Sequence, residues 1–207
     1  MKTGKATGPD DIAAEAWKSC GDVGSAFLTR LFNRVLVEGR MPADWRRSTT
    51  VPIWKQKGDP ASCTTFRPIR ILSHTLKILE RVIDVRIRQV ATINSAQCGF
   101  RPGTDTTDVI FAARQMIEKH REKGQAVHSV FLEMEKAYDR VPRDLIWDAL
   151  REHGVPKEYV RLTKVTYEGS TSQMRTTCGD SAPFGIAVGV HQGSALSPLL
   201  FILCLDT

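Results

Sequence analysis

The sequence predicts a mixed fold of the α+β class, because stretches with helical spacing of apolar residues alternate with stretches typical of strands. The clearest helical pattern covers residues 76–90. A short apolar run at 130–132 ends at carboxylates, and residues 172–190 are typical of a β-hairpin. With 207 residues, of which 42% are hydrophobic, the chain can bury the core of one large domain or of two small ones.

The N-terminal part of the chain is predicted to be helical. Residues 9–35 carry apolar side chains at loose helical spacing, and Pro9 is a typical residue at a helix start. Gly21 and Gly24 predict a break into two helices, because glycine lowers helix stability. Gly39 is expected to end the second helix, since glycine adopts the left-handed conformation found at helix C-termini.

The middle of the chain predicts a strand, a basic turn and two more helices. Residues 51–54 favour a strand that enters a turn at 55–59, which contains two lysines. The pattern at 76–90 gives one apolar helix face with arginines away from it. Asp105 or Thr106 is expected to cap the next helix. The apolar face of that helix would consist of Val109, Ala112, Ala113, Met116 and Ile117.

The C-terminal part predicts two further helices around the hairpin. Leu145 and Leu150 share the face of one helix, which Gly154 is expected to end. Residues 196–205 are strongly apolar and continue as a helix up to the end of the sequence. There are no internal repeats and no low-complexity stretch, so solenoid and disordered classes of protein are excluded.

Residues 129–143 hold the strongest indication of chemistry in the chain. The apolar run ends at Glu133 and Glu135, and Tyr138 and Asp139 follow at once. A buried strand that delivers a carboxylate to a cleft can bind a hard cation such as Mg²⁺, which phosphoryl transfer requires. The alternative is a core strand that ends in solvated surface charges. This stretch alone leaves both interpretations open.

The composition suits a nucleic-acid partner without requiring one. Lysine and arginine number 29 against 23 aspartates and glutamates, which gives a net charge of +6. The cysteine number is odd, no CxxC pair occurs, and reduced thiols are therefore expected in place of a disulfide framework or a zinc site. Neither a signal peptide nor an apolar run of membrane-spanning length is found, so we expect a soluble intracellular protein of the nucleus or cytoplasm.

Several motifs occur in a fixed order around the acidic stretch, and together they are far more specific than any one alone. They are Lys-Ala-Thr-Gly-Pro-Asp-Asp-Ile at 5–12, Val-Pro-Ile-Trp-Lys-Gln-Lys-Gly-Asp at 51–59, Phe-Arg-Pro-Ile at 66–69, Gln-Cys-Gly-Phe-Arg-Pro-Gly at 97–103 and Gly-Val-His-Gln-Gly-Ser-Ala-Leu-Ser-Pro-Leu-Leu-Phe at 189–201. The series resembles the reverse transcriptase (RNA-directed DNA polymerase) domain of non-LTR retrotransposons, of the kind that carries an endonuclease on the same polyprotein. The resemblance extends from about residue 5 to residue 206.

The resemblance implies a right-hand polymerase architecture with fingers and a partial palm. Residues 1–126 would form a fingers-like region with N-terminal helices, and residues 127–207 a truncated palm. The expected partners are an RNA template, a DNA primer and deoxynucleoside triphosphates, with no membrane. Lys2 and Lys5, with scattered arginines, would add salt-sensitive affinity for nucleic acid.

The resemblance also implies a catalytic metal site. In such polymerases two Mg²⁺ ions, or Mn²⁺, align the primer hydroxyl and the triphosphate. Glu133 occupies the position of the first metal-binding carboxylate, with the Met134 carbonyl as a second ligand. The family normally has aspartate there, and glutamate is one methylene longer. Because a displacement of about 1 Å can cost roughly 10²-fold in rate, we expect retained metal binding with poor turnover.

Further residues are implied to contact the nucleotide. Tyr138 matches the aromatic residue that excludes a ribose 2′-hydroxyl, although a core tyrosine with a satisfied hydroxyl is the alternative. Gln192 and Gly193 resemble the loop that holds the templating pair. The triphosphate would be clamped by Lys55, Lys57 and Arg67.

Template and primer contacts are implied for Arg101 and Pro198. Asp139 is expected to brace the turn before Pro142, Glu135 to be a surface charge, and His191 to have no role in function.

The second acidic strand of such a palm would follow some tens of residues beyond Pro198, and the sequence ends before it. A thumb is also missing. The chain is therefore expected to be an inactive fragment of the polymerase, and its unpaired sheet edge to lower solubility. The alternatives are a non-catalytic nucleic-acid-binding module and an interaction domain derived from the enzyme.

Overall fold

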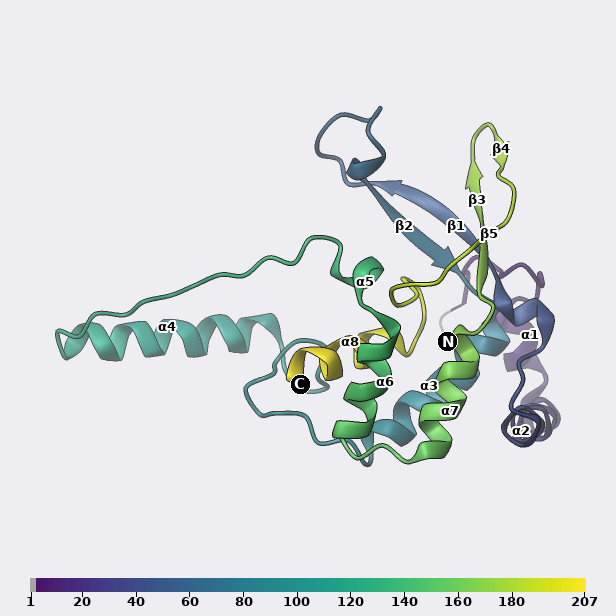
Figure 1. Cartoon of the computed structure of the whole chain (residues 1–207), viewed down its shortest axis with the longest axis horizontal. Coiled ribbons are helices and arrows are strands. Elements are labelled where there is room, and N and C mark those ends of the chain that lie inside the picture. Colours follow the sequence, from purple (N-terminus) through teal and green to yellow (C-terminus); the bar gives the residue numbers. More distant parts are fainter. Residues whose placement is uncertain (1–2) are drawn as a thin grey trace.

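The computed structural model describes residues 3–207, so Lys2 lies outside the described part (Figure 1). Its mixed five-stranded sheet has the order β2-β1-β3-β4, and β5 pairs with β3. The strands are β1 (Arg47–Trp54), β2 (Phe66–Ile71), β3 (Thr171–Thr176), β4 (Gly179–Asp180) and β5 (Phe184–Gly185). The predicted mixture of helices and strands is thereby confirmed.

The sheet combines distant parts of the chain. β1 pairs with β2 in antiparallel register, with Val51 opposite Ile69, and with β3 in parallel register, with Thr49 opposite Gln173. β4 and β5 both run antiparallel to β3, which forms the predicted hairpin region. Because β3 comes from the C-terminal part of the chain, one sheet spans the proposed boundary between residues 126 and 127. That division into two regions stays a prediction.

Helices on one side of the sheet enclose the core (Figure 1). The helices are α1 (Ala14–Ser19), α2 (Gly21–Glu38), α3 (His74–Arg88), α4 (Thr106–Glu122), α5 (Ala137–Arg140), α6 (Arg143–Glu152), α7 (Lys157–Tyr167) and α8 (Ser197–Asp206), with 3₁₀ helices η1 (Ala43–Arg46) and η2 (Cys63–Thr65). α3 buries the predicted face with Leu76, Leu79 and Ile83, and α8 is buried along most of its length. Burial of these apolar side chains is the main stabilising term of the fold.

The start of the first helix was predicted wrongly. Residues 9–10 form a turn, and α1 begins at Ala14. The reason is that this segment packs against the start of α3: Ser73 Oγ donates to Asp10 Oδ2 at 2.5 Å, and a Cβ on Gly8 would lie 2.6 Å from Ser73 Cα. The helix break at Gly21 and the left-handed cap at Gly39 are confirmed, whereas Gly24, the other residue of the predicted break, lies inside α2.

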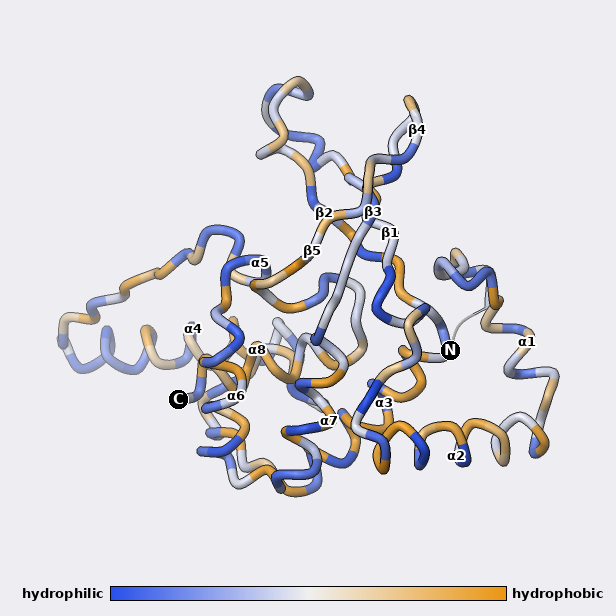
Figure 2. The backbone as a smooth tube through the Cα atoms, turned by 45° about the vertical axis from the view of Figure 1, so that its right-hand side comes forward, coloured by the Kyte–Doolittle hydropathy of each residue, from blue (hydrophilic) through white to orange (hydrophobic). Residues whose placement is uncertain are grey.

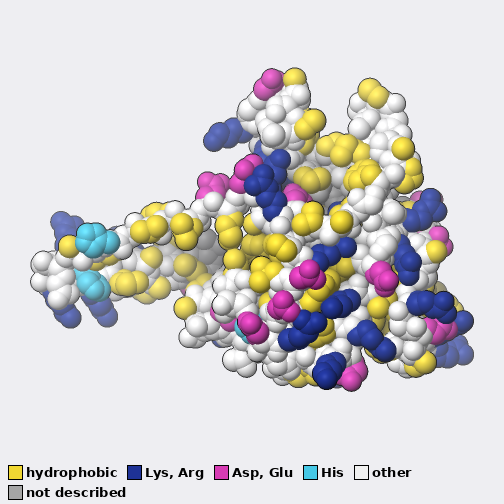
Figure 3. Space-filling view, in the orientation of Figure 1, with side chains coloured by type: hydrophobic (Ala, Val, Ile, Leu, Met, Phe, Trp, Pro, Cys, Tyr) yellow, Lys and Arg dark blue, Asp and Glu magenta, His cyan; other side chains and the backbone are white. Residues whose placement is uncertain are grey.

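α4 forms where predicted but projects away from the rest of the molecule (Figure 1). Asp105 caps it through a capping box with Asp108, as one of the two predicted caps. No described residue of α4 is buried, and its apolar face remains in contact with solvent: Met116 is 57% exposed and Ile117 is 48% exposed. Figure 2 colours several residues of this projection as hydrophobic, and Figure 3 shows hydrophobic side chains along it.

The prediction of a buried strand at residues 130–132 was wrong. Residues 125–134 return from the tip of α4 to α5 without strand pairing, and Phe131 is 94% exposed (Figure 1). A strand needs a hydrogen-bonding neighbour, and within residues 3–207 no strand lies beside this segment. Separately, the helices of the described part include none that is both long and apolar enough to span a membrane.

Candidate functional site

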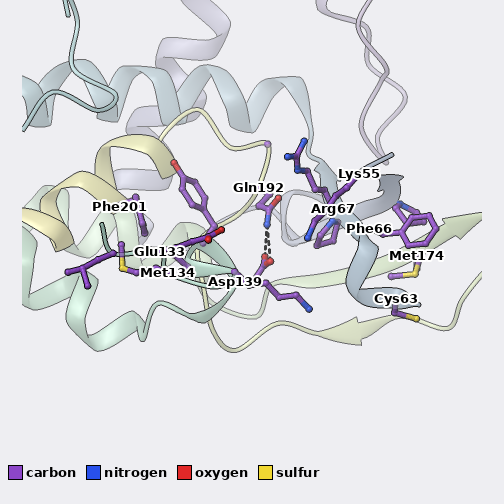
Figure 4. Close-up of a pocket in the computed structure, with 17 residues that line it drawn as sticks. Lys55, Cys63, Phe66, Arg67, Glu133, Met134, Asp139, Met174, Gln192 and Phe201 are labelled. Atoms are coloured by element: carbon purple, nitrogen blue, oxygen red, sulfur yellow. Dashed lines mark hydrogen bonds between the residues drawn. The ribbon is translucent and has the colours of Figure 1, made fainter. Parts of the chain in front are cut away.

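A cavity of about 1100 Å³ lies where the β1–β2 end of the sheet faces α5 and α8 (Figure 4). Three segments far apart in the sequence supply most of its walls: β1 and β2 with the turn between them, residues 132–139, and the loop at 192–193. Met174 of β3 and Phe201 of α8 complete the lining. Seven of the ten predicted site residues line this one cavity. They are Lys55, Arg67, Glu133, Met134, Tyr138, Gln192 and Gly193.

Three predicted site residues do not line the cavity. Lys57 is exposed in the turn that follows β1. Arg101 lies in the loop before α4, where its Nη1 donates to Ser95 O at 3.4 Å. Pro198 occupies the first turn of α8. The sequence motifs contained these residues, but local spacing alone does not reveal which way each side chain points.

Tyr138 forms one wall of the cavity through a rigid aromatic contact. Its ring lies 4.6 Å from that of Phe201 on α8, and the ring of Phe100 meets it edge-on at 6.2 Å. Burial raises the pKa of the Tyr138 hydroxyl to about 12, so the side chain is neutral at physiological pH. Packing on two other rings fixes its position, as expected for a side chain that acts by shape.

Gln192 is fixed by a carboxylate that the sequence analysis assigned elsewhere. Its Nε2 donates to both carboxylate oxygens of Asp139 at 2.9 Å (Figure 4). Asp139 therefore holds the Gln192 side chain, and bracing of the turn before Pro142 was the wrong prediction. The two residues are 53 positions apart, and no local sequence signal could have paired them.

The loop at residues 189–193 is tied to both sides of the cavity. Val190 N donates to Tyr138 O at 2.7 Å, and the backbone of Arg70 on β2 donates to Gln192 O, also at 2.7 Å. Gly193 has φ +119°, and a Cβ there would lie 2.2 Å from Arg70 O. Only glycine fits this combination of backbone conformation and close approach.

Glu80 forms a hydrogen bond with the segment that directly follows this loop, and it was not predicted as a site residue. This carboxyl on α3 is fully buried, and its Oε2 accepts from Ala195 N at 3.0 Å. Burial raises its pKa to about 7, against the lowering effects of Ser194, the Ala195 amide and Lys77. The signal available in the sequence was a glutamate on the otherwise apolar side of the helix at 76–90.

Lys55 and Arg67, on the cationic side of the cavity, have hydrogen-bond donors that no described residue accepts from. Lys55 Nζ donates to Thr64 O at 3.1 Å. The Arg67 guanidinium forms neither a hydrogen bond nor an ion pair with any side chain or backbone group of residues 3–207. A planar guanidinium with free donors facing a cavity is suited to bind phosphate oxygens.

Comparison with known proteins agrees with this arrangement. The model of the family described as "Reverse transcriptase (RNA-dependent DNA polymerase)" matches residues 53–207. The chain belongs to the reverse transcriptase family. Relatives include the "Retrovirus-related Pol polyprotein from type-1 retrotransposable element R2" of Nasonia vitripennis, which is 30% identical over 97% of this chain and 19% of its own length.

Two relatives from Drosophila melanogaster show the same relationship. The R2DM polyprotein is 30% identical over 96% of this chain and 18% of its own length. The "RNA-directed DNA polymerase from mobile element jockey" is 28% identical over 95% of the chain and 22% of its own length. This chain thus spans about a fifth of the length of these relatives, and the predicted kinship with non-LTR retrotransposons is confirmed.

Members of the reverse transcriptase family use divalent metal ions, but the described residues do not complete a metal site. The cavity contains two carboxylates, Glu133 and Asp139, and both oxygens of Asp139 already accept from Gln192. Across residues 3–207 there is no group of three side chains of the metal-binding types. Mg²⁺ requires near-octahedral oxygen coordination, of which Glu133 and the Met134 carbonyl would supply only a part.

Proposed function

We propose that this reverse transcriptase domain contributes the fingers and part of the palm of an RNA-directed DNA polymerase encoded by a non-LTR retrotransposon. Its cavity would receive the incoming deoxynucleoside triphosphate opposite an RNA template, next to a DNA primer. The observation that carries the proposal is the convergence on one cavity of seven residues from three distant segments. The cavity offers cationic side chains for the triphosphate end of such a ligand and Tyr138 and Gln192 for its sugar and base.

Each wall of the cavity suits one part of a nucleotide. Arg67 and Lys55 would bind the triphosphate, because their free donors match its oxygens. Tyr138 would lie against the sugar, where a ring held by Phe201 leaves no room for a 2′-hydroxyl. Gln192, fixed by Asp139, would contact the base pair. Glu133 and the Met134 carbonyl remain proposed metal contacts, and Arg101 and Pro198 proposed template contacts outside the cavity.

Arg67→Gln is expected to weaken binding of dTTP about tenfold or more. Loss of a charge-assisted hydrogen bond to phosphate costs roughly 1.5–3 kcal/mol. The measurement is the dissociation constant of dTTP, by calorimetry with the 207-residue chain. Lys57→Gln removes the same charge from an exposed residue outside the cavity and should change the constant less than twofold. Equal losses in both variants would contradict a specific phosphate contact.

Tyr138→Ala is expected to raise the affinity for UTP relative to dUTP by about tenfold. Removal of the ring opens space beside the sugar, and only the ribonucleotide has a hydroxyl to fill it. Competition binding of the two nucleotides measures the ratio. Tyr138→Phe keeps the ring on Phe201 and serves as the control, with an unchanged ratio. An unchanged ratio in Tyr138→Ala would show that the tyrosine has a purely structural role.

A second candidate is nucleic-acid binding without turnover, and the incomplete metal site favours it. Primer extension on poly-rA with dTTP and Mg²⁺ or Mn²⁺ separates the two. Incorporation by the 207-residue chain would show that its own residues suffice for nucleotidyl transfer. Salt-dependent binding of primer-template without incorporation would support the second candidate for the chain by itself.

A further inference from the structure

One side of α4 carries apolar side chains that no other part of residues 3–207 buries. This α4 face consists of Val109, Ala112, Ala113, Met116 and Ile117, and each of these side chains is exposed. α4 projects from the rest of the molecule (Figure 1), and Figure 3 shows hydrophobic side chains along it. A contiguous apolar face of this kind is rare on a soluble protein and marks a surface of association.

The helix presents this face without support from the core. Asp105 and Asp108 form a capping box at its start, and Arg114 pairs with Glu118 at 2.8 Å on its surface. Such local interactions add only a few tenths of a kcal/mol to about 1 kcal/mol each. Most of the stability of a helix in a protein comes from packing of its apolar face. α4 therefore gains stability from a partner that covers the face.

The charges of α4 indicate which partner fits. Its start is acidic, with Asp105 and Asp108, whereas its last turn is basic, with Lys119 and Arg121. A second α4 that runs antiparallel to the first places each acidic start beside a basic end, and two-fold symmetry makes this contact twice. A parallel pair would bring like charges together. The α4 face is thus complementary to itself in the antiparallel arrangement.

An antiparallel crossing at Ala113 also brings the apolar side chains into register. Val109 and Ile117 lie equally far from Ala113 on either side of it, so Val109 of one copy faces Ile117 of the other. Asp105 and Arg121 have the same relation and meet at the two ends of the contact. Alanine at the crossing point allows the two helix axes to approach closely, while the larger side chains interdigitate on both sides.

A polyanion or an anionic membrane fits this surface less well. Such partners require unpaired cations along the length of a helix. In α4 the Arg114 guanidinium is paired with Glu118, and the start of the helix is acidic. The remaining basic residues lie in the last turn, where they match the acidic start of a second copy.

We propose that the α4 face is a dimerisation surface, which receives α4 of a second copy of this chain in antiparallel orientation with the crossing point at Ala113. The two copies bury Val109, Met116 and Ile117 against each other, and Asp105 of each copy lies beside Arg121 of the other. The dimer is independent of the proposed nucleotide site, because no residue of α4 lines that cavity.

The test is the mass of the 207-residue chain in solution, measured by sedimentation velocity between about 1 and 100 μM. The unmodified chain should dimerise with a dissociation constant on the order of 10 μM. Val109→Lys and Ile117→Glu should each raise this constant about tenfold or more, because each places an unpaired charge in the apolar contact. The matched control is Val37→Glu on α2, where the valine is 83% exposed. It should dimerise like the unmodified chain.

An equimolar mixture of Val109→Lys and Ile117→Glu tests the orientation. In the antiparallel dimer the new ammonium of one variant faces the new carboxylate of the other, so the mixture should dimerise within about threefold of the unmodified chain. In a parallel pair the two charges would lie at different heights along the helix. Loss of dimers in both variants without recovery in the mixture would therefore overturn the antiparallel register.

The remaining outcomes decide on the surface itself. A monomer at every concentration of the unmodified chain, or a dimer that survives both substitutions, would refute α4 as the contact. Assemblies larger than a dimer would refute a closed two-fold pair. The fluorescence of the buried Trp45 and Trp147 should be the same in all variants, since α4 contributes no buried residue to the core. This second readout separates loss of the contact from loss of the fold.

Discussion

Gly193→Ala is expected to destabilise the folded state by about 2 to 4 kcal/mol and to lower the melting temperature by about 10 °C. Two effects add. The backbone at Gly193 has φ +119°, which side-chain-bearing residues rarely adopt, and a Cβ would lie 2.2 Å from Arg70 O. β2 is paired along its length with β1 and cannot move aside. The loop must therefore shift, which disturbs the Gln192 contacts to Arg70 and Asp139.

The matched control is Gly185→Ala. Gly185 lies in β5, and a Cβ at this position would meet nothing within 4 Å. This variant should melt within about 2 °C of the unmodified chain, in thermal unfolding followed by circular dichroism. Equal melting temperatures for Gly193→Ala and Gly185→Ala would show that the loop can move to accommodate the Cβ atom without loss of folding stability. Gly193→Ala should also abolish measurable dTTP binding if Gln192 needs its present position.

The sequence predicted the helices best where their apolar face meets a core. The helical spacing at 76–90 became α3, because Leu79 and Ile83 lie against other helices of the core. The same spacing produced α4, yet its face is exposed, because helical periodicity indicates only that a face is apolar and not what covers it. The strand at 130–132 failed for a related reason. A strand is stabilised by backbone hydrogen bonds to a neighbouring strand, and no strand within residues 3–207 pairs with this segment.

The candidate site was predictable in its members and not in their mutual contacts. Motif order brought together residues of the cavity that are more than 100 positions apart, such as Arg67 and Gln192. The hydrogen bonds that fix them were not predictable, because nothing in the sequence around Asp139 indicates that Gln192 is its partner. Burial of His74 was not predictable for the same reason, because its surroundings come from other elements. For Glu80 the only signal was its position on the apolar side of the helix at 76–90.

Glu80 makes the stability of the fold dependent on pH. Burial raises its pKa from 4.5 to about 7, so between these values the folded state holds a proton that the unfolded state has released. The folded state is therefore favoured at low pH, and stability falls as the pH rises through this window. The full effect is roughly 3 kcal/mol, complete above pH 7. Glu80→Gln, which cannot ionise, should remove it.

The expected result is a melting temperature for Glu80→Gln that exceeds that of the unmodified chain by about 6 to 12 °C at pH 8 and differs little at pH 5. The amide oxygen can still accept from Ala195 N, so the loop contact survives the change. Glu158→Gln, on the exposed first turn of α7, is the control and should give equal changes at both pH values. A Glu80→Gln protein that is less stable at pH 8 would mean that the charged carboxylate stabilises the loop. The negative charge beneath Ala195 would then be part of what holds Gln192 and Gly193 at the cavity.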